Sequence, residues 1–174
     1  RVVPVTTRAQ LRQFVELPYR LYRHDDNWVA PLRSEQRAQF DPERNPMLAH
    51  CEVALFLLMD RTPIGRISAF VDRLAMETWG QPIGLFGSFE CGGGAEGAQL
   101  LLEAARHWLR TRGMARMRGP WSFASQEWGL VVEGFQPPAV IMAPQNPPIY
   151  NDWLTAFGQQ KAKDLLVYVA DARE

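Results

Sequence analysis

Apolar side chains recur along the chain with the periods of both strands and helices, so a mixed fold is expected. Residues 1–5 read as a short strand, and Thr6 or Thr7 can cap the helix that follows. Pro18 is expected to kink or end that helix. A second, shorter helix is predicted over residues 33–40, before a break rich in charged residues and proline.

Three strands are expected next, arranged as a meander. Residues 52–60 are apolar enough for a central strand, and residues 64–72 alternate well enough to pair with it after a tight turn. A loop is expected over 77–82, and residues 83–90 read as the third strand.

The clearest helix in the sequence covers residues 95–112. It has an apolar face opposite a charged one, and Gly113 stands where a C-terminal cap belongs. The predicted apolar face consists of Leu100, Leu101, Ala104, Ala105, Trp108 and Leu109.

The rest of the chain reads as short elements. A strand over 114–118, extended segments at 128–132 and 139–142, a helix over 148–156 and a closing strand over 163–170 are predicted. The order of elements indicates an α/β (α+β) domain, in which strands and helices share one core.

Composition and charge narrow the class of protein. A length of 174 residues fits one domain (1–174), and 47% hydrophobic with 22% charged residues is a globular balance. Because 19 Lys and Arg balance 19 Asp and Glu, no net basic field attracts nucleic acid or an anionic membrane. No apolar run is long enough to span a bilayer and no signal peptide is evident, so a cytoplasmic protein is expected. Since the chain starts at Arg1, we expect it to be part of a longer protein.

A glycine-rich turn joins the third meander strand to the long helix. It reads Cys91, Gly92, Gly93, Gly94, Ala95, Glu96 and Gly97. Free amide groups and the dipole at a helix start favour a phosphate, and glycine lets it approach the backbone. Two alternatives are a surface connection without a ligand and the G-x-G-x-x-G of a dinucleotide fold, although no acidic residue follows where that fold needs one.

Several stretches resemble the GNAT superfamily, the Gcn5-related N-acetyltransferases, and in particular a bacterial GNAT-like group. They are 25–29, 65–67, 86–90, 118–120 and 146–150. The resemblance covers nearly the whole chain and implies a mixed, mostly antiparallel central sheet flanked by helices. It also implies that the turn binds the pyrophosphate of acetyl-CoA or another acyl-CoA, and that a second GNAT-like half can follow.

The turn departs from the GNAT pattern in part. When the pattern is anchored on the pair Leu100–Leu101, Gly97 matches the final small position, whereas Ala95 and Gly92 replace a glycine and a Gln or Arg. Related enzymes also use a tyrosine four residues before a glycine on the later helix. Counted back from Gly158, that position is Leu154.

Acyl transfer to an amine needs a group that takes the amine proton and one that protonates the leaving thiolate. Glu90 lies at the strand end where related enzymes often place a base, and Glu127 lies in a loop beside another strand end. Tyr150 stands one helical turn before Leu154 and is the candidate proton donor. Each glutamate has a structural alternative, as a surface carboxylate or as a partner of the helix N-terminus, and Tyr150 does not stand at the position of the family's tyrosine.

Other reactive residues are interpreted as structural. His50 and Cys51 are adjacent and cannot form a tetrahedral metal site alone, so no metal is predicted. Asn146 is expected to stabilise the Asn–Pro–Pro turn, and Trp121 and Trp128 to anchor packing or line a substrate cleft.

The sequence thus predicts an acyl-CoA-dependent N-acyltransferase, with acetyl as the expected acyl group, that acts by direct transfer on a small-molecule or peptide amine. The alternative is a non-catalytic GNAT-like domain that pairs with a second domain or subunit, including a homodimer partner.

Overall fold

One five-stranded sheet forms the centre of the molecule. The computed structural model describes residues 1–123, 128–135 and 143–168. The strands follow chain order across the sheet: β1 (Val2–Pro4), β2 (Cys51–Met59), β3 (Pro63–Asp72), β4 (Ile83–Cys91) and β5 (Arg116–Arg118). Neighbouring strands are antiparallel except β4 and β5, which are parallel. The predicted mixed, mostly antiparallel sheet is therefore confirmed.

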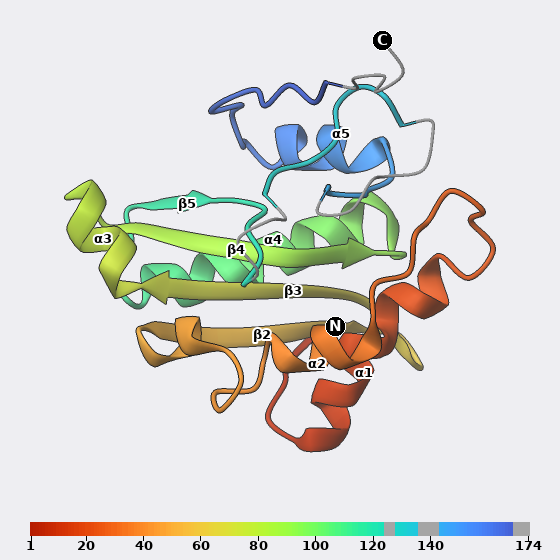
Figure 1. The fold of residues 1–174 in the computed structure, drawn as a ribbon, viewed down its shortest axis with the longest axis horizontal. Coiled ribbons are helices and arrows are strands. Elements are labelled where there is room, and N and C mark those ends of the chain that lie inside the picture. The colour runs from red at the N-terminus through yellow and green to blue at the C-terminus, as the bar shows by residue number, and fades with distance from the viewer. Residues whose placement is uncertain (124–127, 136–142, 169–174) are drawn as a thin grey trace, which may run out of the picture.

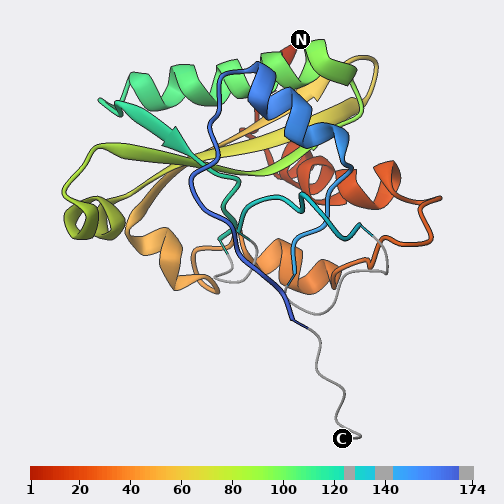
Figure 2. The ribbon, with the colours of Figure 1, turned by 90° about the horizontal axis from the view of Figure 1, so that it is seen from above.

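Helices cover both faces of this sheet (Figures 1 and 2). They are α1 (Arg8–Leu21), α2 (Arg33–Ala38), the 3-10 turn η1 (Pro46–Ala49), α3 (Arg73–Trp79), α4 (Gly94–Arg110) and α5 (Ile149–Ala156). The long helix α4 lies on one face, and α1 and α2 lie on the other. No helix in the described part of the chain is both long and apolar enough to cross a membrane.

Helix α1 begins where its sequence predicts and continues past its proline. The Thr7 hydroxyl accepts a hydrogen bond from the Gln10 amide, and the Gln10 side chain accepts one from the Thr7 amide, which is a capping box. Pro18 lies inside the helix, which ends only at Leu21. Proline leaves the carbonyl of Phe14, four residues earlier, without a helical donor. The Arg66 guanidinium donates to that carbonyl at 2.9 Å instead.

The apolar face of α4 is rotated from the predicted one. Leu101, Leu102 and Ala105 are buried against the sheet, whereas Leu100 is 44% exposed. The N-terminal end of the helix fixes this rotation, because Gly97 and Ala98 already face the strands.

Two further segments differ from the sequence predictions. The predicted loop 77–82 overlaps α3, which Asp72 caps and which ends at Gly80 with φ 62°. Residues 163–168 form no strand, and Leu165 to Tyr168 are 65–83% exposed. A strand needs a partner for its backbone groups, and the described residues offer none there. The predicted segment 139–142 and residues 169–170 lie outside the described residues.

Candidate active site

The carboxyl end of β4 lies free of its neighbour β5. The two strands pair only from Ile83 to Leu85. One residue further along β4, the Phe86 carbonyl accepts a hydrogen bond from the Trp121 amide, which follows β5, at 2.8 Å. Beyond Phe86, helix α5 takes the place of a paired strand: Tyr150 packs edge-on against Phe89, with ring centroids 5.1 Å apart. The end of β4 is thus open to side chains from other elements.

A bulge in β4 turns its last residues relative to β3. Arg66 of β3 pairs with Glu90, but Ser68 pairs with Gly87, so β4 has two residues where β3 has one. Ser88, in the bulge, has φ 46°. Bulges re-aim the side chains that follow them, and Glu90 is the first paired residue after this one.

Glu90 lies at the centre of a cluster built from three distant parts of the chain. The Tyr22 hydroxyl, from the end of α1, donates a short hydrogen bond to Glu90 Oε2. The Tyr150 hydroxyl, from α5, donates to the same oxygen at 3.2 Å, and the two phenol oxygens are 3.1 Å apart. Tyr150 also accepts the Cys91 amide at 2.8 Å, which ties α5 to the end of β4. One carboxylate oxygen is therefore shared by two phenols.

Burial and the carboxylate keep both phenols protonated. Removal from water, followed by the negative charge of Glu90, raises the pKa of Tyr22 and that of Tyr150 well above the ordinary value of 10.0. At neutral pH both hydroxyls therefore keep their protons and can act as hydrogen-bond donors.

Arg66 supplies the positive charge next to this cluster. Its guanidinium is almost fully buried, with Nη2 3.9 Å from Glu90 Oε1. It also lies over the Phe14 ring, 5.1 Å from the centroid. Because its Nη1 donates to the carbonyl that Pro18 leaves open, the arginine is held between α1 and the sheet. The cluster thus combines an anchored cation, a carboxylate and two neutral phenols.

The glycine-rich turn leads directly from this cluster into α4. Gly93 is the N-cap of the helix, Gly94 is its first residue with φ 67°, and no side chain caps this end. The first N–H groups of a helix have no intrahelical acceptor, so they are available to an outside group. Glu96 lies in the same first turn and contributes an acidic side chain there.

Packing accounts for three of the glycines in the turn. A Cβ at Gly93 or Gly97 would lie 2.8 Å from Leu58 Cδ2, and one at Gly92 would lie 3.0 Å from Leu21 Cδ2. Gly94 alone faces open space. Cys91 is buried, with Sγ 3.6 Å from the Gly94 carbonyl, and burial raises its pKa. Close packing against Leu58 and Leu21 therefore favours glycine at these three positions whether or not a phosphate binds.

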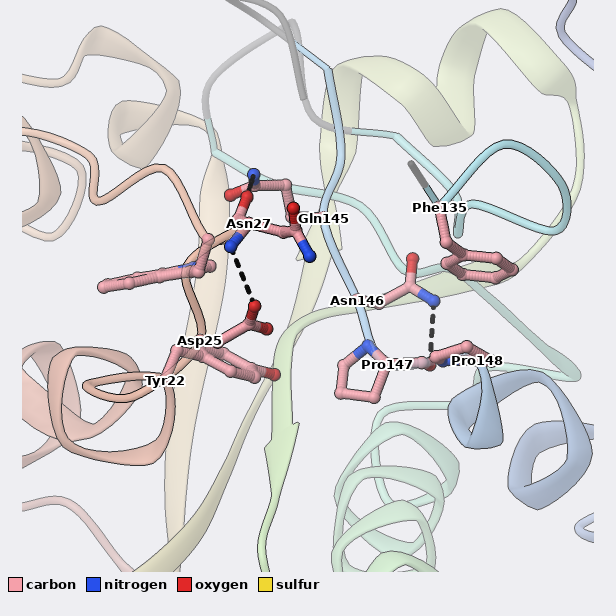
Figure 3. Close-up of a pocket in the computed structure, with 9 residues that line it drawn as sticks. Tyr22, Asp25, Asn27, Phe135, Gln145, Asn146, Pro147 and Pro148 are labelled. Atoms are coloured by element: carbon pink, nitrogen blue, oxygen red, sulfur yellow. Dashed lines mark hydrogen bonds between the residues drawn. The ribbon is translucent and has the colours of Figure 1, made fainter. Parts of the chain in front are cut away.

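A cavity of about 210 Å³ opens on the Tyr22 side of the cluster (Figure 3). One wall comes from the segment after α1 and includes Asp25 and Trp28. The opposite wall includes Phe135 and the segment before α5, where Gln145 bridges the walls by donating to the Asn27 carbonyl and accepting the Val29 amide. Asp25 Oδ1 accepts the Asn27 amide at 3.0 Å, which fixes the turn that presents its carboxylate.

A second hollow, of about 270 Å³, lies between α4 and α5. It starts at Ala95 in the first turn of α4, continues past Gln99 to Arg106, and is walled by Trp153 and Phe157 of the opposite helix. The Arg106 guanidinium lies over the Phe157 ring, 4.8 Å from the centroid. The first turn of α4 thus borders a groove with aromatic walls, in which Arg106 forms an ion pair with Glu103.

The structure brings some predicted site residues together and assigns others elsewhere. Glu90, Tyr150 and the turn 91–97 meet, whereas Glu127 lies outside the described residues. Asn146 lines the cavity, and its side chain accepts a hydrogen bond from the backbone amide of Val131 and donates one to the carbonyl of the same residue. Trp121 and Trp128 stack on one another at 4.6 Å.

Sequence reasoning missed Tyr22 and Arg66 as site residues. Tyr22 read as part of the apolar face of α1. Arg66 offered a usable signal, because a single arginine inside an otherwise apolar strand requires a buried partner.

No protein-family model matches the chain. Two curated bacterial proteins do. The chain is 37% identical over 173 residues to "Bacterial ceramide synthase" of Caulobacter vibrioides, covering 98% of this chain and 45% of that protein. It is 32% identical over 163 residues to "Protein YghO" of Escherichia coli, covering 92% and 42%. The chain therefore spans less than half the length of these relatives.

Solved acetyltransferases share the fold. One is glucosamine-6-phosphate N-acetyltransferase from Arabidopsis thaliana, at 8% identity and TM-score 0.55, covering 98% of each chain. Another is an acetyltransferase of Trypanosoma brucei, at 10% identity and TM-score 0.52, covering 97% and 99%. The chain has the GNAT fold that its sequence predicts, and its resemblance to a bacterial group is supported by both curated relatives.

Proposed function

We propose that this chain is the catalytic domain of an acyl-CoA-dependent N-acyltransferase. The observation that carries the proposal is the cluster of Glu90, Tyr22 and Tyr150 at the open end of β4. Tyr22 of this cluster lines a cavity with a carboxylate, and the turn after Glu90 leads into α4, whose uncapped first turn contributes Ala95 to the groove. An acyl transfer that joins two substrates needs such an arrangement, with proton-transfer groups between two binding sites.

The residues around the α4 N-terminus fit an acyl-CoA. The amides of 93–96 suit a pyrophosphate, and Gly94 leaves room for its approach. The rings of Trp153 and Phe157 suit the base of the nucleotide end, and Arg106 suits its phosphate if the nucleotide displaces Glu103, the present ion-pair partner of Arg106. The carboxylate of Glu96 opposes an anion in the same turn, so binding depends on the amides and the cation outweighing it.

The cluster provides a path for two protons. Acyl-CoA, when bound, supplies an activated thioester carbonyl. Tyr22 faces both the cavity and Glu90, so its oxygen takes the proton of the attacking amine while its own proton passes to Glu90 Oε2. Tyr150 would be the proton donor for the sulfur of a bound acyl-CoA, and Glu90, to which it is hydrogen-bonded, would return a proton to it. The amine loses one proton and the thiolate gains one, so the cluster ends as it began.

Cavity chemistry favours an amine with a compact polar head. Asp25 offers a carboxylate to an ammonium group, and Trp28 offers a ring face. The cavity volume of about 210 Å³ is smaller than that of sites for drug-sized ligands, which is about 300–1,000 Å³. The head of a long substrate therefore fits in the cavity, whereas its tail does not. The name of the Caulobacter relative supports a long-chain amino alcohol as acceptor and a fatty acyl group as donor.

A non-catalytic GNAT-like half is the second candidate function. The Cys91 amide, at the open end of β4, is already bound by Tyr150 and is not free for a ligand. The relatives are also more than twice as long as the matched region, which leaves room for a second domain in them. In this alternative, the present chain supports a site completed by another domain or subunit.

Titration calorimetry with acetyl-CoA, a long-chain acyl-CoA and NADPH separates these functions. The proposal expects binding of an acyl-CoA and not of NADPH. Release of free CoA thiol, measured with a thiol reagent, is then expected only when a long-chain amino alcohol or another amine is added. Binding without thiol release from the full-length protein would favour the non-catalytic half, and no binding to any CoA ester would overturn the proposal.

A further inference from the structure

Three potential ligands meet at the end of the sheet remote from Glu90. They are His50, Cys51 and Asp72, and their ligand atoms all lie within 4.8 Å of one another. Asp72 ends β3, whereas Arg66, opposite Glu90, lies six residues earlier on that strand. At about 3.3 Å per residue the two places are about 20 Å apart. This cluster is therefore separate from the proposed acyl-transfer site.

Strand pairing explains how the three side chains converge. Cys51 is the first residue of β2 and pairs directly with Asp72 across the sheet. Directly opposed residues of an antiparallel pair point to the same face. His50 precedes the strand as the C-cap of η1, with φ −117° and ψ 5°, so the alternation of a strand does not force its ring to the other face. Strand pairing therefore brings Asp72 to the adjacent residues His50 and Cys51, although it lies 21 residues after Cys51 in the sequence.

Two of the three distances between ligand atoms are close to those around a tetrahedral zinc ion. His50 Nδ1 lies 2.9 Å from Asp72 Oδ1 and 3.8 Å from Cys51 Sγ. A tetrahedral zinc ion with ordinary bond lengths holds nitrogen and oxygen ligands about 3.3 Å apart and nitrogen and sulfur about 3.6 Å apart. These two distances differ from their targets by a few tenths of an ångström, and the third pair, a sulfur and a carboxylate oxygen, lies within 4.8 Å, so side-chain shifts would close the site around an ion.

We propose that His50, Cys51 and Asp72 bind a transition-metal ion, with Zn²⁺ as the best match, and leave its fourth position to water. Thiolate, imidazole and carboxylate are the ligands that zinc takes in proteins, and three protein ligands with one open position are a recurrent zinc arrangement. The His50 and Asp72 side chains are 28% and 11% exposed, so the site is reachable from solvent. The ion would connect η1, β2 and the start of α3.

Nucleophilic catalysis by Cys51 does not fit the geometry. A Cys–His–Asp relay needs both ring nitrogens of the histidine, one toward the thiol and one toward the carboxylate. Here Nδ1 faces both partners. Burial, followed by the charge of Asp72, also raises the pKa of Cys51 to about 12, so the thiol carries its proton in the absence of a cation.

Metal binding would replace that proton. The Cys51 Sγ–H bond breaks, its proton passes to the buffer, and sulfur bonds to the ion, which also takes the place of the hydrogen bond between His50 and Asp72. No electron is transferred. One proton is therefore released for each Cys51 thiol that becomes a metal-bound thiolate.

Titration of the reduced, chelator-treated protein with Co²⁺ tests the site directly. We expect binding of one ion with a thiolate-to-cobalt charge-transfer band in the near ultraviolet, which Zn²⁺ then removes. Calorimetry of Zn²⁺ binding in two buffers of different ionisation enthalpy is expected to show release of about one proton per ion. Zn²⁺, and not Mg²⁺, is expected to raise the melting temperature.

Matched variants decide which side chains are responsible. Cys51→Ser is expected to abolish the band and the thermal shift while the circular dichroism of the folded protein is kept, because the hydroxyl fills nearly the same space. His107→Gln, a histidine on the exposed side of α4, is expected to keep both signals. The proposal would be overturned if the unmodified protein showed no band or if Cys51→Ser kept it. It would also be overturned if Cys91→Ser lost the band while Cys51→Ser did not.

Discussion

The hydroxyl of Tyr150 lies 3.2 Å from Glu90 Oε2 and at the same time accepts the backbone amide of Cys91. A phenol in this position is fixed by two groups of β4, although it comes from a helix 59 residues further along the chain. Its single proton points toward the carboxylate. The end of β4 therefore holds a proton donor and a proton acceptor in fixed contact, and each can be removed separately.

Replacement of Glu90 by glutamine is expected to lower kcat for amide formation by about 10²- to 10⁴-fold, the usual contribution of a general base. Glutamine keeps an oxygen that both phenols can reach but cannot take a proton. The Kd for acyl-CoA should change little, and Glu77→Gln, at an exposed carboxylate of α3 outside both hollows, serves as the control. Turnover of Glu90→Gln at the unmodified rate would remove Glu90 from the mechanism.

The two tyrosines are expected to fail in different ways. Tyr150→Phe should lower kcat for acyl donors with poor leaving groups most, because it removes the donor to sulfur. It should also lower the free energy of unfolding by about 1–3 kcal/mol, since the buried Cys91 amide loses its acceptor. Tyr22→Phe should instead lower kcat by a factor that depends on the basicity of the acceptor amine, because it removes the group that takes the amine proton. Steady-state kinetics with matched donor and amine series distinguish the two, and identical profiles would contradict the assignment.

Asp25→Asn tests the amine cavity. The asparagine oxygen can still accept the Asn27 amide, so the turn is kept while the negative charge is lost. Loss of a charge-assisted hydrogen bond of about 1.5–3 kcal/mol raises KM for the amine by about one to two orders of magnitude. The neighbouring Asp26→Asn, outside the cavity lining, is the control. Equal KM values for both variants would show that the amine binds elsewhere.

Stability is expected to fall in alkali from about pH 10. The pKa of Tyr22 and that of Tyr150 are raised in the folded state above the ordinary value of 10.0, so the folded protein binds more protons than the unfolded chain above that pH. The stabilising contribution is complete below pH 10 and is lost as the pH rises. Urea unfolding at successive pH values should show this decline, with a shallower slope in Tyr22→Phe. An unchanged slope would mean that the phenol is not buried in solution.

Gly87→Ala is expected to destabilise the protein more than Gly93→Ala. A Cβ at Gly87 would lie 1.8 Å from the Trp121 carbonyl oxygen, so backbone must move, whereas one at Gly93 meets the end of the Leu58 side chain at 2.8 Å. Neither glycine has positive φ, so the comparison isolates packing. Overpacking costs about 1–3 kcal/mol, and Gly87→Ala belongs at or above the upper end. Denaturant unfolding gives the free energy of unfolding of each variant. A larger loss in Gly93→Ala than in Gly87→Ala would contradict the close approach of the Trp121 backbone to Gly87.

Local signals predicted the fold well. Thr7 and Gln10 form a capping box, the meander pairs in the predicted order, and the glycine-rich turn starts a long helix. The helix 73–79 was missed because its cap, Asp72, also reads as the end of a strand. The strand over 163–170 was predicted from apolar residues alone, and an apolar run cannot reveal whether another strand is there to pair with it.

The site was predictable only in part, because its contacts are long-range. The sequence singled out Glu90 and Tyr150 through their places beside a turn and on a helix, and the structure brings these two side chains into contact. Tyr22 meets Glu90 from 68 residues away, and only the tertiary fold shows that a residue on the apolar side of α1 ends in a polar cluster. The same holds for Asp72, which strand register brings to His50 and Cys51. Spacing along the sequence cannot show these pairs.

Tyr22 has a consequence for any attempt to redesign acceptor preference. Tyr22 lines the cavity, and its hydroxyl donates a hydrogen bond to Glu90, so in the proposed mechanism one side chain serves both recognition of the amine and movement of its proton. In that mechanism, enlarging the cavity at this wall would disable the chemistry that the new substrate needs. Libraries should therefore vary the opposite wall, at Phe135 and Gln145, where cavity shape can change without touching the carboxylate.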